Sequence, residues 1–184
     1  GILKGSPNQT VAQQMDWVDN SQHEAQRMKG LVDDLLFLAK ADSAHIEVPM
    51  ETVNLSDCVT THALSFESVA FEQGVSIELE AEPDIEIRGN EPQLKQLVGI
   101  LLDNAVKYSN KGGAVSLGLE KRQGNAELSV QNLGAPISAE DQKHLFERFY
   151  RADVSRSEAG YGLGLSIAKA IVDNHNGKIA VSST

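Results

Sequence analysis

A single helical pattern over residues 11–42 constrains the fold more than any other part of the sequence. Apolar or small side chains recur there every three or four positions, at Val11, Met15, Val18, Ala25, Met28, Val32, Leu35 and Ala39. A helix of about 30 residues is about 45 Å long, too long for one small globular domain to cover. The stripe therefore predicts packing against another helix, from the same chain or from a second subunit.

The rest of the chain alternates helices and strands that are joined by short turns. Residues 43–54 are interpreted as a linker, and a helix is predicted from Leu55, capped by Asn54 or Ser56 and stopped by Gly74. Further elements are predicted as strands at 75–80 and 85–87, a helix at 92–109, strands at 114–120 and 126–131, a short helix from 138 toward 149, a helix opening at 160–164 and running to 174, and a closing strand at 178–182. Because several strands adjoin through hairpin-like turns, the sheet is expected to be mixed. The fold class is α+β: a two-layer α/β sandwich with helices on one face, preceded by the long helix.

The charge of the chain limits which ligands it can hold. There are 26 acidic and 16 basic residues, a net charge of −10, which argues against a general nucleic-acid or anionic-membrane surface. A phosphate-bearing ligand must therefore be bound locally, by a few cations, backbone N–H groups or a bridging metal. The longest apolar run, 97–102, is far too short to span a bilayer, and no secretion leader opens the chain. The single cysteine, Cys58, excludes an internal disulfide framework.

The predicted helix at 92–109 carries a polar group of three residues near its end. Asn104 and Lys107 are three apart and share one face, with Tyr108 one turn beyond Asn104. An amide oxygen can ligate Mg²⁺, an ammonium can meet a phosphate, and an aromatic ring can pack on a base. Taken alone, the same pattern also fits an ordinary amphipathic helix with a polar back.

Two glycine-containing turns follow. The strand ending at Asn132 leads into a turn at Gly134, where a side-chain carbonyl could accept a hydrogen bond from an adenine amino group; a plain turn would look the same. Glycines alternate at 160–164 directly before an apolar helix, whose first N–H groups form a ready anion site. The spacing matches neither a dinucleotide fingerprint nor a P-loop. Residues 152–159, polar and aperiodic, suggest a flap over a nucleotide site or a plain surface loop.

In their order and spacing, these segments resemble the N, G1, F and G2 boxes of the histidine-kinase ATPase fold. That fold is shared more loosely with gyrase, the Hsp90 chaperones and mismatch-repair ATPases. The runs 104–108, 146–151 and 160–165 are more similar to sensor histidine kinases than to those cousins, and 11–42 is similar to the second helix of their dimerisation hairpin. The resemblance implies a partial dimerisation and phosphoacceptor hairpin at 1–42, a linker at 43–54 and a catalytic ATP-binding domain of the Bergerat type at 55–184.

The resemblance also implies roles for individual residues. Asn104 would ligate Mg²⁺, Lys107 and Arg151 would contact phosphate oxygens, and Tyr108 would pack near the adenine. Asn132 stands where the family most often has the aspartate that reads the adenine amino group. The expected ATP site comprises Asn104, Lys107, Tyr108, Asn132, Gly134, Ile137, Arg151, Gly160, Gly162, Leu163, Gly164 and Leu165.

Several positions depart from the family pattern. Asn132 keeps an acceptor oxygen but lacks the charge, Pro136 replaces a G1 glycine, Ala159 replaces a frequent G2 glycine, and Ile100 replaces a frequent asparagine. The strand that usually follows Thr184 is expected to be absent, which would leave a truncated chain or an open sheet edge. The family's phosphoacceptor histidine box is not found, and the chain's histidines are interpreted as surface or packing residues: His23, His45, His62, His144 and His175.

These observations predict the ATP-binding catalytic part of a protein-histidine kinase that uses ATP and Mg²⁺. Its γ-phosphoryl group would go to a histidine upstream of residue 1, then to an aspartate of a response regulator, and the chain alone would not label itself. The full-length protein would be a homodimer at the cytoplasmic face of the cell membrane, which it would meet only through segments outside this sequence. Two alternatives remain open: a related ATPase or anti-sigma-type serine kinase, and a degenerate, non-enzymatic dimerisation or docking module.

Overall fold

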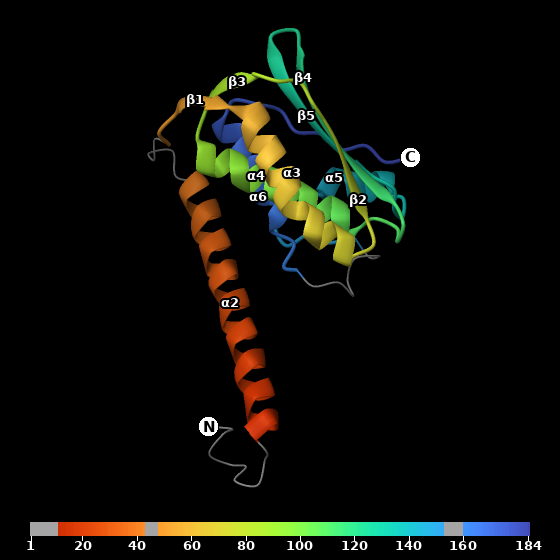
Figure 1. Cartoon of the computed structure of the whole chain (residues 1–184). Coiled ribbons are helices and arrows are strands. Elements are labelled where there is room, and N and C mark those ends of the chain that lie inside the picture. The colour runs from red at the N-terminus through yellow and green to blue at the C-terminus, as the bar shows by residue number, and fades with distance from the viewer. Residues whose placement is uncertain (1–10, 43–47, 153–159) are drawn as a thin grey trace. The chain divides into compact units, whose positions relative to one another are not determined.

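The computed structural model describes residues 11–42, 48–152 and 160–184. The chain divides into two compact units, Gly1–Ser43 and Ala44–Thr184, and each is described by itself. Figure 1 shows the helix of the first unit and the helices and strands of the second.

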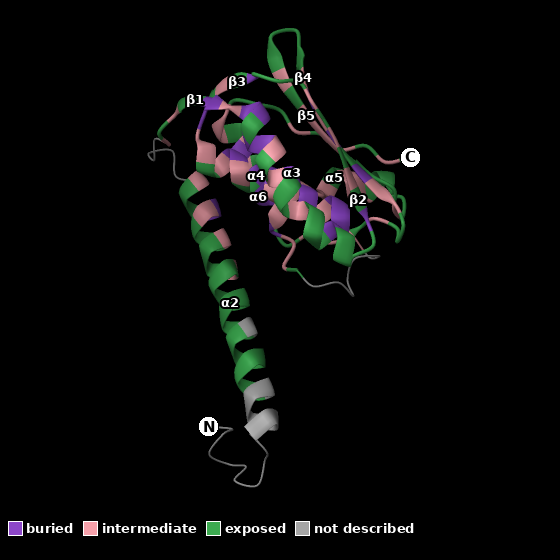
Figure 2. Ribbon diagram, viewed as in Figure 1, coloured by how far each residue is buried: buried purple, intermediate pink, exposed green. Residues whose placement is uncertain are grey.

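The first unit is built on one helix, α2 (Val11–Ala41), which confirms the predicted long helix. Its described apolar side chains include six that are exposed: Trp17, Val18, Met28, Val32, Leu35 and Leu36. Most of the described part of α2 is coloured as exposed in Figure 2. Within the described residues, no helix of the chain is both long enough and apolar enough to cross a membrane.

The second unit holds the remaining elements. In chain order these are β1 (Glu51–Asn54), α3 (Leu55–Glu72), β2 (Ser76–Ala81), β3 (Glu86–Gly89), α4 (Glu91–Lys107), β4 (Ala114–Arg122), β5 (Asn125–Asn132), α5 (Ala139–His144) and α6 (Gly164–Asn174).

Side-chain caps fix where three of these helices begin. Asn54 accepts a hydrogen bond from the backbone N–H of Asp57 at 3.1 Å, and Asn90 accepts one from Gln93 at 3.1 Å. The hydroxyl oxygen of Ser138 accepts from the N–H of Asp141 at 3.0 Å. Each cap satisfies a backbone donor that the first helical turn leaves unpaired. The predicted starts of α3 and α4 are thereby confirmed.

The central sheet has the order β2-β4-β5 and is mixed, as predicted. β2 runs parallel to β4, with Ser76 opposite Ala114, and β4 runs antiparallel to β5, with Leu119 opposite Leu128. β1 and β3 form a separate antiparallel pair. Helix α4 packs against both α3 and α6, and the helices form a layer over one face of the three-stranded sheet (Figure 1).

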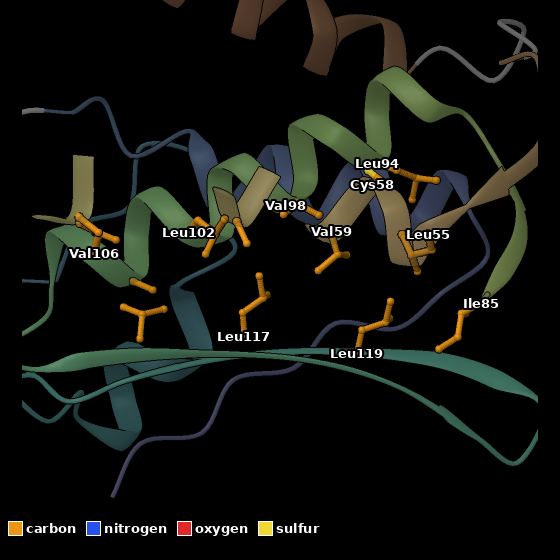
Figure 3. Packing of buried hydrophobic residues seen from close by; sticks show 14 of the residues in the cluster. Leu55, Cys58, Val59, Ile85, Leu94, Val98, Leu102, Val106, Leu117 and Leu119 are labelled. Atoms are coloured by element: carbon orange, nitrogen blue, oxygen red, sulfur yellow. The ribbon is translucent and has the colours of Figure 1, made fainter. Parts of the chain in front are cut away.

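A single hydrophobic core lies between the helix layer and the sheet. Val59 of α3 and Val98 and Leu102 of α4 are completely buried and point toward Leu117 and Leu119 of β4, both 1% exposed (Figure 3). Cys58 belongs to the same cluster. This layer fixes the orientation of α4, which carries Asn104, Lys107 and the cap residue Tyr108.

Strand β1 lies within residues interpreted as a linker and was not predicted. It is only four residues long, and it forms because Val53 pairs with Ile87 and Glu51 with Gly89 of β3. Such pairing partners, distant in sequence, are invisible to a local pattern. The second unit therefore uses residues from β1 onward.

Two other predictions were wrong. No strand forms over residues 178–184, all of which the structure describes, although Ile179 and Val181 are half-buried between exposed neighbours. That alternation produced the predicted strand, but a strand also needs a backbone ladder, which this segment lacks. The helix predicted from 138 toward 149 ends at His144, and Phe149 adopts a φ of 62°, which no α-helix can contain.

Candidate functional site

The C-terminal end of α4 and the turn after β5 form one tight corner. Tyr108 is the C-cap residue of α4, and its carbonyl oxygen accepts a hydrogen bond from Nδ2 of Asn132 at 3.1 Å. The N–H of Asn110 donates to the carbonyl of Leu133 at 2.7 Å. A Cβ at Gly134 would lie 2.1 Å from the Tyr108 oxygen, so this close approach requires glycine. Two motifs that are separate in the sequence thus share one backbone junction.

Asn104 lies one helical turn before this corner. Its Nδ2 donates to the carbonyl of Ile100 at 2.8 Å, so its Oδ1 is the atom left to accept or to ligate. Gly164, the first residue of α6, lies against the same side chain: a Cβ there would be 3.6 Å from Nδ2 of Asn104 and 3.5 Å from Cγ2 of Ile100. The start of α6 therefore meets the polar face of α4.

Two cations lie around Gly160. A Cβ on this glycine would be 3.4 Å from Nζ of Lys107, and Nη1 of Arg151 donates to its carbonyl oxygen at 3.1 Å. The Lys107 ammonium is also 5.2 Å from the centre of the Tyr108 ring, within the range of a cation–π interaction. In a chain of net charge −10, this is a local concentration of positive charge.

Helix α6 begins without a side-chain cap among the described residues. Its N-cap residue, Leu163, is 2% exposed, and the carbonyl of Leu163 accepts from the hydroxyl of Ser166 at 2.8 Å. Uncapped N–H groups at the positive end of a helix attract anions. Leu165 follows in the first turn and is half-buried.

Gly162 links the glycine-rich stretch to the segment after α5. Its carbonyl accepts from the N–H of Phe149 at 2.9 Å, its φ is 71°, and a Cβ would lie 2.7 Å from the Tyr150 carbonyl. The hydroxyl of Tyr150 in turn donates to Asp141 at 2.5 Å. Hydrogen bonds from Ser138 and then Tyr150 hold the pKa of Asp141 below its ordinary value. A stable carboxylate on α5 therefore anchors the segment that carries Arg151.

The structure brings most of the expected residues together in three groups. Asn104 lies with Gly164, Lys107 and Arg151 lie with Gly160, and Tyr108 lies with Asn132 and Gly134. Ile137 has a different contact, because its N–H donates to the hydroxyl of Ser183 at 2.9 Å. Gly162 contacts the Phe149–Arg151 segment instead of α4. Ala159, expected to replace a frequent glycine, lies outside the described residues.

Two structural features were missed from the sequence: the side-chain support of the Ile137 backbone and the turn at Phe149. Ser183 holds the backbone of Ile137, and Gln142 reinforces it by donating to the Ile137 carbonyl at 2.8 Å. Phe149 makes the sharp turn that delivers Arg151, in a positive-φ conformation that is rare for a bulky residue. The contact between Ser183 and Ile137 joins residues 46 positions apart, so no local pattern predicts it. No sequence signal indicates a positive φ at an aromatic residue such as Phe149.

Within the described part of the chain, no three His, Cys, Asp or Glu side chains gather as a group that could hold a metal ion. A magnesium site formed by one amide oxygen together with phosphate oxygens and water is of a different kind, because Mg²⁺ usually keeps several waters and shares its ligands with substrate phosphates. The Oδ1 of Asn104, whose Nδ2 is bound to the Ile100 carbonyl, fits that kind of site.

Residues 89–184 match the family described as histidine kinase-, DNA gyrase B- and HSP90-like ATPase. The sensor histidine kinase YkoH of Bacillus subtilis (strain 168) is 41% identical over 162 residues, 87% of this chain and 35% of its own length. The sensor protein DltS of Streptococcus agalactiae serotype V is 38% identical over 164 residues, 89% of this chain and 42% of its own. The solved mycobacterial sensor histidine kinase MprB has a TM-score of 0.62 at 29% identity, covering 70% of this chain and 81% of that one.

The chain spans less than half the length of the two curated relatives. Its order of motifs, its mixed sheet and its helix layer agree with the family match over more than half of the sequence. The chain therefore belongs to the histidine kinase-, DNA gyrase B- and HSP90-like ATPase family, and it is the ATP-binding catalytic part of a sensor histidine kinase.

Proposed function

We propose that this catalytic unit binds ATP with Mg²⁺ and positions the γ-phosphoryl group for transfer to a histidine. One observation carries the proposal: two glycines of the 160–164 stretch lie against two side chains three residues apart on α4. A Cβ on Gly164 would be 3.6 Å from Nδ2 of Asn104, and a Cβ on Gly160 would be 3.4 Å from Nζ of Lys107. The start of α6, the Asn104 amide and the Lys107 ammonium thus lie within van der Waals contact distance of one glycine-rich stretch.

The roles follow from the chemistry of each group. Asn104 would ligate Mg²⁺ through Oδ1, and Lys107 and Arg151 would bind phosphate oxygens. Backbone N–H groups at Gly160, Gly162, Leu163, Gly164 and Leu165 would complete the phosphate site. Mg²⁺ would neutralise charge on the phosphates, and phosphoryl transfer needs little else from the protein beyond positioning.

The base would lie at the corner between α4 and β5. Tyr108 is 38% exposed there, and its ring would pack against a purine face, with Ile137 as the apolar residue beyond the turn. Asn132 is exposed and would accept a hydrogen bond from the adenine amino group. Gly134 is required for the close approach described above.

We also propose the wider setting that the family implies. The exposed apolar side chains of α2 support a helical hairpin at 1–42 that dimerises in the full-length protein. A linker follows at 43–54. Its last residues form β1, which pairs with β3 and is therefore structurally part of the catalytic unit. The phosphoryl group would pass to a response-regulator aspartate, and the parent protein would act at the cytoplasmic face of the membrane.

Calorimetry with ATP and ADP, in Mg²⁺ and in EDTA, tests the binding proposal. Asn104→Ala and Asn104→Asp should each weaken Mg²⁺-dependent binding by at least about tenfold, because Ala removes the amide ligand and Asp places a negative charge beside the phosphate groups. Asn174→Ala is the matched control, since its amide lies at the last residue of α6 and donates to Gln93 near the start of α4 at 3.3 Å. Circular dichroism should show all three variants folded. Unchanged affinity in the Asn104 variants would remove this residue from the site, and absence of any binding by the wild type would favour a docking module.

A further inference from the structure

The side chain of Tyr150 ties the segment that carries Arg151 to helix α5. Its hydroxyl donates to Oδ1 of Asp141 at 2.5 Å, a contact between residues nine positions apart. A phenol has a single proton, so a hydroxyl that donates it to a carboxylate has none left for a phosphate oxygen, which can only accept. Tyr150 therefore lies beside the phosphate-binding residues in sequence but binds to the protein itself.

The carboxylate that receives this bond is fixed through both of its oxygens. Ser138, the N-cap residue of α5, donates its hydroxyl to Oδ2 of Asp141 at 2.6 Å and accepts the backbone N–H of Asp141 at 3.0 Å. The remaining oxygen, Oδ1, accepts from Tyr150. Hydrogen bonds to both oxygens prevent the carboxylate from turning, so Asp141 offers the Tyr150 hydroxyl one fixed position.

The ring of Tyr150 has a second contact on the same helix. Its centroid lies 5.5 Å from that of the His144 ring, and the two planes are tilted by 37°. The His144 ring is itself held, because its Nδ1 lies 2.8 Å from Oε1 of Glu147. Both the hydroxyl and the ring of Tyr150 are thus placed by groups on or just after α5.

The opposite side of this segment contacts the glycine-rich stretch. The Phe149 N–H donates to the Gly162 carbonyl at 2.9 Å, and Nη1 of Arg151 donates to the Gly160 carbonyl at 3.1 Å. A Cβ on Gly160 would be 3.4 Å from Nζ of Lys107, so two cations meet at one glycine. Because like charges repel, a long arginine side chain stays beside this ammonium only if its backbone is held there.

We propose that Tyr150 and Asp141 are positioning residues that hold Arg151 at the phosphate end of the nucleotide site. The inference rests on the proposed function, in which Arg151 binds phosphate oxygens. Neither Tyr150 nor Asp141 touches the nucleotide, and both act through the guanidinium of Arg151. Loss of the Tyr150 hydroxyl should therefore reduce nucleotide affinity only while Arg151 is present.

A double-mutant cycle on the full chain tests this dependence. Calorimetry with ATP in Mg²⁺ gives the affinities of the wild type, Tyr150→Phe, Arg151→Ala and the double variant, and circular dichroism checks that each is folded. Tyr150→Phe should weaken binding by about threefold to tenfold, because one hydrogen bond to a charged group is lost. Arg151→Ala should weaken it at least as much, and the double variant should bind ATP as Arg151→Ala does.

The matched control is Ser65→Ala, which removes a hydroxyl that donates to the His62 carbonyl at 2.7 Å on α3. Its ATP affinity should equal that of the wild type. Wild-type affinity in Tyr150→Phe, or losses that add in the double variant, would overturn the inference while leaving nucleotide binding intact. Absence of binding by the wild type would instead overturn the proposed function.

Substitutions at Asp141 separate positioning from charge. Asp141→Asn keeps an oxygen that can accept from Tyr150, so its ATP affinity should stay within about twofold of the wild type. Asp141→Ala removes the acceptor and should weaken binding about as much as Tyr150→Phe. A carboxylate that acted only through its charge would repel the triphosphate, and both variants would then bind ATP more tightly than the wild type. That result would overturn the inference.

Discussion

The ring of His175 joins the end of α6 to the start of α4: its Nε2 accepts the backbone N–H of Asn90 at 3.0 Å. Its Nδ1 lies 2.7 Å from the Ile171 carbonyl, which can only accept, so Nδ1 is the donor of this pair. The same ring covers Gly89, where a Cβ would come within 3.0 Å of it. One histidine thus connects the helix that carries Asn104 with the helix that begins at Gly164.

His175→Phe should lower the free energy of unfolding by about 1–3 kcal/mol, because the ring volume is kept while the Asn90 N–H loses its acceptor. Urea unfolding followed by circular dichroism measures the change. His62→Phe is the matched control, because its buried Nδ1 has no hydrogen-bond partner among the described residues. An equal loss in both variants would show that the bond to Asn90 contributes little.

Leu102→Ala should lower the free energy of unfolding by about 2–5 kcal/mol, since the side chain is completely buried between α4 and the sheet. Leu64→Ala, on the exposed side of α3 at 59% exposure, should change it by less than about 0.5 kcal/mol. Both values come from the same urea titration. Similar costs for the two variants would contradict the core of Figure 3.

Gly162→Ala should weaken both stability and nucleotide binding. The substitution strains a backbone with φ of 71° and places Cβ 2.7 Å from the Tyr150 carbonyl, at a cost of about 1–3 kcal/mol. Thermal unfolding with and without Mg-ADP measures both effects. The control is Gly30→Ala in α2, because a Cβ at this position meets nothing within 4 Å. This substitution should stabilise the helix by about 0.5–1 kcal/mol. A Gly162→Ala protein that retains wild-type stability would show that this turn is not constrained.

His144 should make a small, pH-dependent contribution to stability. Hydrogen bonds to Glu147 and then Glu140 raise its pKa above the ordinary 6.5. Because the folded pKa exceeds the unfolded one, the contribution is complete below pH 6.5 and is lost as the pH rises through the raised folded value. The difference in Tm between wild type and His144→Gln should therefore be larger at acidic than at alkaline pH, though small for an exposed side chain.

Lys169→Gln supplies the comparison for this titration. Lys169 forms an ion pair with Asp173 at 3.0 Å that contains no histidine, the side chain whose ordinary pKa lies near neutral pH. Its effect on Tm should stay constant across the pH series. A constant effect for His144→Gln as well would contradict the assigned role of Glu147.

Local patterns in the sequence located most of the helices, although the helix from residue 138 was predicted to run too far. The caps Asn54 and Asn90 sit directly before apolar periodicity, and these two features together located the starts of α3 and α4. Strands were less predictable, because a strand is completed by a partner elsewhere in the chain. β1 was missed since its partner is β3, and 178–182 was predicted as a strand although it has no ladder.

The candidate site was predictable only through resemblance. Asn104 and Lys107 alone also fit the polar back of a helix, and Gly134 alone fits any turn. Their convergence depends on how α4, β5 and α6 pack, which no local pattern contains. The hydrogen bond from Nδ2 of Asn132 depends on the Tyr108 carbonyl, a backbone atom whose position only the folded chain reveals.

The parallel pairing of β2 with β4 has a consequence for synthesis on the ribosome. Ser76 cannot meet Ala114 until β3, the whole of α4 and the following turn have been translated. At roughly 5–20 residues per second, β2 waits several seconds with its backbone donors and acceptors unpaired. During that interval the nascent strand is open to pairing with other polypeptides, so holding by a chaperone would benefit this segment.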